Sequence, residues 1–194
     1  MKKSAIFIAL TFVFSWALAL GFRLLGGEWN TVTATVLAIG YMFIPMLVAL
    51  FLQKVVYRQA VREPLGLRFR PNRWFLLAWL LPATVSLAAA GVALLLPGVS
   101  FSPGMEGMMA RYADLLSPEQ LALMQEQIAA MPIHPMWLGL IQGLVAGLTI
   151  NAVAGFGEEL GWRGFLHDQF RSMNFWKAAV LTGLIWGVWH APLI

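Results

Sequence analysis

The chain has no cysteine and very little charge. Without cysteine, disulfide bonds and thiolate chemistry are excluded, so the sequence carries no information about the redox state of its compartment. Only 11% of the 194 residues are charged, whereas about 25% is usual in a soluble domain. With 60% hydrophobic residues and a mean hydropathy of +0.74, the chain cannot cover itself with a polar surface. An ordinary soluble domain is therefore excluded.

The apolar residues come in long runs, which predicts a helical membrane protein rather than a β-barrel. The predicted fold class is all-α, a polytopic bundle of transmembrane helices that forms a single domain over residues 1–194. A cleaved signal peptide is the alternative for the first run, but its apolar residues continue to Phe22, which favours a retained helix. About five spans are expected, at Ser4–Leu20, Thr31–Leu52, Trp74–Leu96, Met136–Phe170 and Lys177–Ile194.

Basic residues are distributed unevenly between the loops, and this asymmetry predicts an orientation. The loop at residues 53–73 holds six bases and one acid, while the loop at residues 97–135 holds one base and four acids. The positive-inside rule puts the first loop, the N-terminus and the turn near Asn174 in the cytoplasm. We expect an integral membrane protein, in contact with lipid. The net charge of +4 reflects this topology rather than a nucleic-acid partner, and the oligomeric state is left open.

The acidic loop contains a possible helix start. Ser117-Pro118-Glu119 could cap a short helix that reaches Ala130. A plain connector is the interpretation that we prefer for this stretch.

Three charges interrupt the apolar sequence within six positions, at Glu158, Glu159 and Arg163. An ionisable residue inside a span costs about 2.5 to 3.5 kcal/mol on insertion scales, so three of them need a reason. Glu159 and Arg163 stand at i and i+4 on one helix face and are expected to pair. Glu158 is rotated by about 100° from Glu159 and is left as a surplus carboxylate.

A histidine on the last apolar segment is expected to lie at the depth of this surplus carboxylate. Glu158 and His190 are each sixteen residues from the turn at Asn174, and two antiparallel helices rise equally from a turn. Trp186 lies on the same face as His190, four residues earlier. Small residues are predicted to let the two helices approach closely, namely Gly155, Gly157, Gly161, Gly164, Gly183 and Gly187.

Several chemistries fit a carboxylate and an imidazole at one depth. They could deprotonate a water as general bases, bind a metal, or relay protons. A purely structural interpretation is a buried clasp of Glu159 with Arg163, in which His190 is a satisfied polar group. The clasp leaves Glu158 unexplained.

The pattern Glu158-Glu159-x-x-x-Arg163, followed by Trp186-x-x-x-His190, resembles the first two motifs of the CPBP family. This family comprises the CAAX-protease and bacteriocin-processing (Abi) intramembrane proteases. Its second motif usually has Phe where this chain has Trp186. The motif pair lies within residues 136–194, and the helices upstream share only the family's layout.

The resemblance implies an intramembrane endopeptidase that acts on a peptide or protein substrate. Glu158 would activate a water with His190 as its partner, Glu159 and Arg163 would orient the site, and Trp186 would pack against it. A glutamate mechanism requires no cofactor. Zinc held by Glu158 and His190 is the alternative, although the sequence has no His-Glu-x-x-His signature.

One family motif, His-x-x-x-Asn or His-x-x-x-Asp, has no counterpart here. The residues that follow the three histidines at the required spacing are Leu138, Arg171 and Ile194. We therefore expect the 194 residues to be an incomplete version of a longer protein and to be inactive alone.

Three functions remain open at this level. The first is proteolysis, in CAAX processing, bacteriocin or peptide maturation, or self-immunity. The second is a non-catalytic membrane scaffold or immunity protein with the same fold. The third is a proton-coupled transporter, which is disfavoured because no inverted pair of broken segments is visible.

The orientation can be tested with single cysteines, since the chain has none of its own. We predict that cysteine at Gln59 is shielded from an impermeant thiol reagent in intact cells, because the basic loop faces the cytoplasm. Cysteine at Gln120 should react under the same conditions. Labelling in the opposite sense would invert the topology.

Overall fold

The computed structural model describes residues 2–194, and within them every regular element is a helix. The predicted all-α class is confirmed. The chain divides into two compact units, one formed by the residues up to Arg70 together with Ile150–Ile194, the other by Pro71–Thr149.

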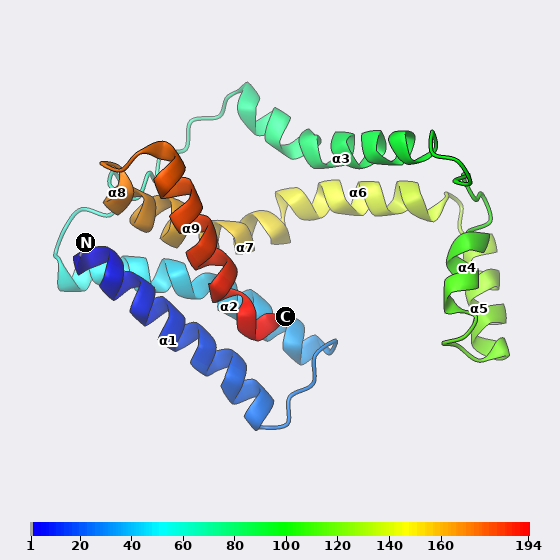
Figure 1. The fold of residues 1–194 in the computed structure, drawn as a ribbon, viewed down its shortest axis with the longest axis horizontal. Coiled ribbons are helices and arrows are strands. Elements are labelled where there is room, and N and C mark those ends of the chain that lie inside the picture. Colours follow the sequence, from blue (N-terminus) through cyan, green and yellow to red (C-terminus); the bar gives the residue numbers. More distant parts are fainter. Residues whose placement is uncertain (1) are drawn as a thin grey trace. The chain divides into compact units, whose positions relative to one another are not determined.

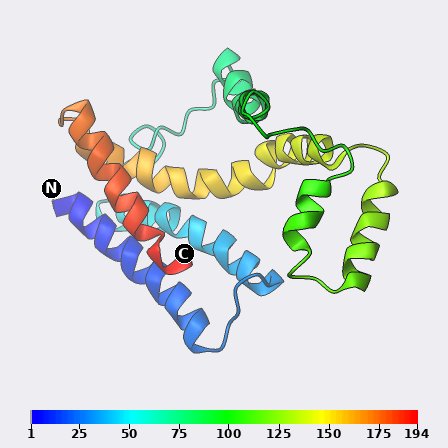
Figure 2. The same ribbon diagram turned by 45° about the vertical axis from the view of Figure 1, so that its right-hand side comes forward.

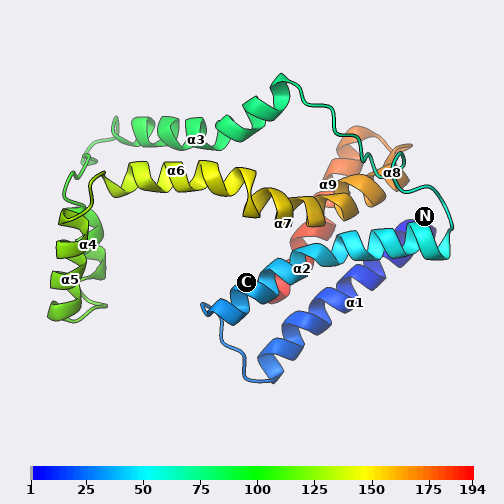
Figure 3. The same ribbon diagram turned by 180° about the vertical axis from the view of Figure 1, so that it is seen from behind.

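The first unit combines two N-terminal helices with a C-terminal group that packs on them (Figure 1). The N-terminal pair is α1 (Lys2–Leu24) and α2 (Val32–Leu50), which continues as the π-helix η1 (Phe51–Val56). Figure 3 shows α7 lying along α2. The C-terminal group consists of α7 (Ile150–Glu159), the π-helix η2 (Leu160–Leu166), α8 (His167–Phe170), α9 (Phe175–Trp189) and the 3-10 turn η3 (Ala191–Leu193).

The second unit consists of α3 (Arg73–Ala93), α4 (Glu106–Tyr112), α5 (Pro118–Ala129) and α6 (Pro135–Leu148). The indole Nε1 of Trp79 on α3 donates to the Leu144 carbonyl oxygen of α6 at 2.8 Å, which ties these two helices together. Figure 2 shows α4 and α5 as a hairpin of two short helices.

The preference for a plain connector in the acidic loop was wrong. The Ser117 hydroxyl accepts from the Gln120 backbone N–H, and the Gln120 side chain accepts from the Ser117 N–H, which completes a capping box at the start of α5.

Three or four of the five expected spans are long and apolar enough to cross a membrane. Three are single helices, namely α1, α2 with η1, and α3. The fourth is interrupted at Thr149, whose φ of −116° and ψ of −104° are not helical, so α6 and Ile150–Phe170 qualify only as one broken span. The fifth, α9, has 15 residues, fewer than the roughly 20 that a span needs.

Glycines on one face of the C-terminal group allow it to lie directly on α2. A Cβ added at Gly157 would come within 2.8 Å of the Phe43 ring, and one added at Gly161 within 2.7 Å of the Pro45 carbonyl carbon. No atom lies within 4 Å of such a Cβ at Gly183 or Gly187 on α9, nor at Gly155. The predicted close approach therefore exists, but its partner is α2 and not α9.

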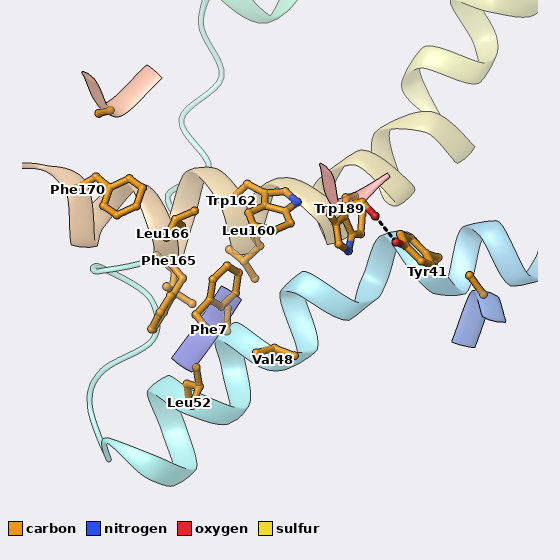
Figure 4. Packing of buried hydrophobic residues seen from close by; sticks show 14 residues of the cluster. Phe7, Tyr41, Val48, Leu52, Leu160, Trp162, Phe165, Leu166, Phe170 and Trp189 are labelled. Carbon is orange, nitrogen blue, oxygen red and sulfur yellow. Dashed lines mark hydrogen bonds between the residues drawn. The ribbon is translucent and has the colours of Figure 1, made fainter. Parts of the chain in front are cut away.

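An aromatic cluster forms the core of the first unit (Figure 4). Phe7 of α1 packs edge-on against Trp162 of η2, with ring centroids 5.4 Å apart, and lies 5.0 Å from Phe165. Trp162 packs in turn on Trp189 of α9 at 5.4 Å, and Trp189 on Tyr41 of α2 at 4.7 Å. All five side chains are fully buried, so the cluster joins α1, α2, η2 and α9.

The glycine contact predicts a position-dependent effect of adding one methyl group. Gly161→Ala should destabilise the protein by about 1 to 3 kcal/mol, because the new Cβ meets backbone that cannot rotate away. Gly155→Ala is the matched control, since the same change meets nothing there and should be neutral or slightly stabilising. Thermal unfolding in detergent measures both, and equal melting temperatures would contradict the close approach.

Candidate active site

The carboxylate of Glu158 is buried near the end of α7. Glu158 is 6% exposed, and the nearby Gly157 and Leu160 are also buried. The indole Nε1–H of Trp186 on α9 donates a hydrogen bond to Oε1 of Glu158. A buried carboxylate needs such a partner, because desolvation of an unpaired charge is very costly. The carboxylate that the Glu159–Arg163 pair leaves over thus has a hydrogen-bond partner on α9.

Glu159 and Arg163 form the predicted i, i+4 pair, with Arg163 Nε and Glu159 Oε2 3.4 Å apart. The Arg163 side chain is 64% exposed and the Glu159 side chain is 44% exposed. This arrangement is not the buried clasp of the structural interpretation. Of the two adjacent carboxylates, the protein itself buries only Glu158.

On α9, the hydrogen-bond partner of Glu158 lies one helical turn before the histidine to which the depth argument pointed. Trp186, and not His190, provides the direct contact with Glu158 across the two helices. The imidazole of His190 packs against the same indole, with ring centroids 4.4 Å apart, and against Trp189 at 4.5 Å. Trp186 thus contacts both predicted catalytic residues.

His190 ends α9, and a hydrogen bond orients its ring. Its Nδ1 lies 3.0 Å from the Trp186 carbonyl oxygen. A carbonyl only accepts, so the proton of a neutral imidazole in this bond is on Nδ1. The lone pair is then on Nε2, which becomes the nitrogen able to accept a hydrogen bond.

The helix end next to His190 is held by both N-terminal helices. The Trp189 carbonyl oxygen accepts from the Tyr41 hydroxyl at 2.5 Å and from Trp16 Nε1 at 3.2 Å, and the Tyr41 bond is drawn in Figure 4. Trp189 Nε1 donates to the Ser15 hydroxyl at 2.8 Å. Since the last carbonyls of a helix lack partners within the helix, these bonds stabilise the end of α9.

Sequence reasoning missed Ser15, Trp16 and Tyr41. A signal for the α1 contact was present, because small or polar residues recur along one face of an otherwise apolar helix. Such residues typically mark helix contacts in membranes. The buried positions of α1 are Ser4, Phe7, Thr11, Ser15 and Ala19.

The two candidate zinc ligands, Glu158 and His190, are not joined by a third in the part of the chain that the structure describes. Within residues 2–194, no group of three His, Asp or Glu side chains is placed to hold a metal ion. Glu158 and His190 would supply two ligands, whereas catalytic zinc usually has three from the protein.

Comparison with known proteins finds a similar family for the C-terminal third of the chain. Residues 132–194 match the sequence model of the Rce1-like family, described as type II CAAX prenyl endopeptidase Rce1-like. CAAX prenyl protease 2 of Methanococcus maripaludis is 50% identical over 48 residues, which are 24% of this chain and 18% of that relative. The match thus spans less than a fifth of the relative's length. No solved structure matches the chain.

The Glu158–Trp186 bond predicts that one N–H group carries measurable stability. Trp186→Phe keeps an aromatic ring but removes the donor, and should cost about 1.5 to 3 kcal/mol because the acceptor is a carboxylate. Trp176→Phe on the same helix is the control, since Trp176 is 73% exposed and its substitution should stay within about 0.5 kcal/mol.

A double-mutant cycle isolates the bond. In a Glu158→Leu background, Trp186→Phe should lower the free energy of unfolding clearly less than it does in the unmodified protein. The same loss in both backgrounds would show that the indole stabilises the fold by packing alone.

Proposed function

We propose that this chain, whose residues 132–194 match the Rce1-like CAAX prenyl endopeptidase model, carries part of the active site of an intramembrane endopeptidase. The family match supports a peptidase, and the three or four apolar helices suggest an integral membrane protein. One observation carries the finer proposal. A buried carboxylate, Glu158, is held through one oxygen by an indole on which the imidazole of His190 also packs.

In the proposed reaction Glu158 is the general base. Trp186 occupies Oε1, which leaves Oε2 to accept a proton from a water molecule. The water oxygen adds to the carbonyl carbon of the scissile peptide bond. The proton then passes from Glu158 to the departing amine as the C–N bond breaks. General acid–base catalysis of this kind contributes about 10² to 10⁴ in rate.

His190 would position the same water. With the proton of its imidazole on Nδ1, Nε2 can accept a hydrogen bond from the water and fix its second hydrogen. The contacts of its ring with Trp186 and Trp189 restrict its rotation. Glu159 and Arg163 would orient the helix that carries Glu158, by pairing with each other on an adjacent face.

The substrate and the orientation are parts of the same proposal. The matched relative is named a CAAX prenyl protease, so a peptide ending in CAAX with a prenylated cysteine is the first substrate to test. Maturation of a bacteriocin-type peptide or self-immunity is the second. We place the protein in the bacterial plasma membrane with its N-terminus in the cytoplasm.

Contacts within the first unit support this orientation. Lys3 Nζ donates to the Gln59 side-chain oxygen at 3.0 Å and lies 4.4 Å from the centroid of the Tyr57 ring. A polar cavity of about 650 Å³ is lined by Lys3, Gln59 and Arg171, among others. Three segments expected on the cytoplasmic side therefore lie together.

The catalytic assignment predicts that, in a longer protein that supplies the rest of the active site, Glu158→Gln and His190→Ala each lower hydrolysis in membranes by about 10² or more, because each removes a group that handles the water. Glu119→Gln on the exposed helix α5 is the control and should leave the rate unchanged. Cleavage of a prenylated CAAX peptide, with thermal unfolding measured in parallel, provides the readout.

Two results would overturn the assignment. Substantial turnover by folded Glu158→Gln protein would show that Glu158 is not the general base. A cellular phenotype that survives this substitution would favour the non-catalytic scaffold.

A further inference from the structure

A groove lies between η2–α8 and α9 on the first unit, with a volume of about 560 Å³. Trp162, Phe170 and Ala178 form part of its apolar wall. The ionisable groups on its lining are Arg163, His167 and Arg171. The groove thus combines an apolar interior with a lining whose only charged side chains are basic.

The guanidinium groups retain free donors. Arg171 Nη1 lies 3.8 Å from Asp168 Oδ1, and Arg163 meets Glu159 through Nε alone. Each guanidinium carries five N–H donors, so one weak pair leaves most of them available. The Arg171 and Arg163 side chains are 81% and 64% exposed. A phosphate could therefore approach them without displacing any buried partner.

Small side chains of α9 line the groove away from these basic groups. Ala179 and Gly183 lie one turn apart on the same face, and Trp186 follows. No atom lies within 4 Å of a Cβ added at Gly183, so there is open space above this position. A narrow, unbranched hydrocarbon chain fits such a strip, because small side chains let it contact the helix backbone closely.

We propose that this groove binds an anionic glycerophospholipid. Its phosphate lies at Arg171 and His167, with Arg163 adjacent, and one acyl chain lies along Ala179 and Gly183 toward Trp186. Charge complementarity selects an anionic head group, and the apolar strip selects a molecule with a tail over a free anion. Basic pockets between membrane helices on the cytoplasmic side recognise lipid head groups in this way. The proposal does not depend on hydrolysis.

The test uses the whole chain in detergent, with phosphatidylglycerol and phosphatidylcholine of identical acyl chains as probes. Native mass spectrometry should show preferential retention of phosphatidylglycerol. Arg171→Gln should weaken its binding by about fivefold, since one basic residue near a lipid surface contributes about 1 kcal/mol. Lys177→Gln is the control, because Lys177 is a base on α9 that does not line the groove. It should leave binding unchanged.

A second pair of variants tests the position of the acyl chain. Gly183→Leu fills the strip, whereas Gly187→Leu adds the same side chain one turn further along α9, outside the groove lining. Retention of both lipids should fall for Gly183→Leu and not for Gly187→Leu. Neither substitution meets an existing atom at Cβ, so both variants should fold.

Several outcomes would overturn the lipid site. Equal retention of the two lipids would show that the groove does not select an anionic head group. Equal effects of Arg171→Gln and Lys177→Gln would show that the head group does not bind at Arg171. Full displacement of the lipid by inorganic phosphate would indicate a site for a free anion. Glu158→Gln protein should bind phosphatidylglycerol normally, which separates failure of the lipid site from failure of the proposed catalysis.

Discussion

The contact of α7 and η2 with α2 determines where the charged residues of the C-terminal group are placed. Gly157 and Gly161 are four residues apart on one face, and neither position has room for a Cβ against Phe43 or Pro45. Because the helix lies this close to α2, Glu158 between the two glycines becomes buried while Arg163 stays uncovered. A side chain at either glycine would separate the helices and expose the carboxylate.

Tryptophan residues connect this contact to the rest of the unit. Trp162 fills the space between η2 and α1, Trp189 receives and donates the hydrogen bonds that hold the end of α9, and Trp186 joins α9 to Glu158. The indoles of Trp186 and Trp189 each combine a large apolar surface with an N–H that donates, to Glu158 and to Ser15, which suits a place that is mostly apolar and has one polar atom to satisfy. The site is therefore assembled by aromatic residues from helices that are distant in sequence.

The same helix α9 contributes to two chemically different places. Its C-terminal turn presents Trp186 to a buried carboxylate and packs His190 on the same indole, while its earlier turns offer small residues beside exposed guanidinium groups. The proposed peptidase site and the proposed lipid site meet at Trp186, which bonds to Glu158 and also lines the groove. Lipid bound in the groove would lie against the residue that positions the proposed general base.

The sequence was informative where local pattern determines structure. Low charge and long apolar runs predicted an all-helical membrane fold, the i, i+4 spacing predicted the Glu159–Arg163 pair, and the motif spacing indicated the type of family whose model matches residues 132–194. It was less informative about boundaries. The break at Thr149 follows no Gly or Pro rule, and α9 is shorter than its apolar run suggested.

By itself, the sequence determined which residues carry charge within the apolar segments and how they are spaced along their own helices. Only the tertiary structure decided that Glu158 bonds to Trp186, that Gly157 and Gly161 face α2, and that Ser15, Trp16 and Tyr41 hold the end of α9. The physical reason is that helical periodicity relates residues within one helix. The register and rotation between two helices are set by side-chain packing, which one helix does not encode alone.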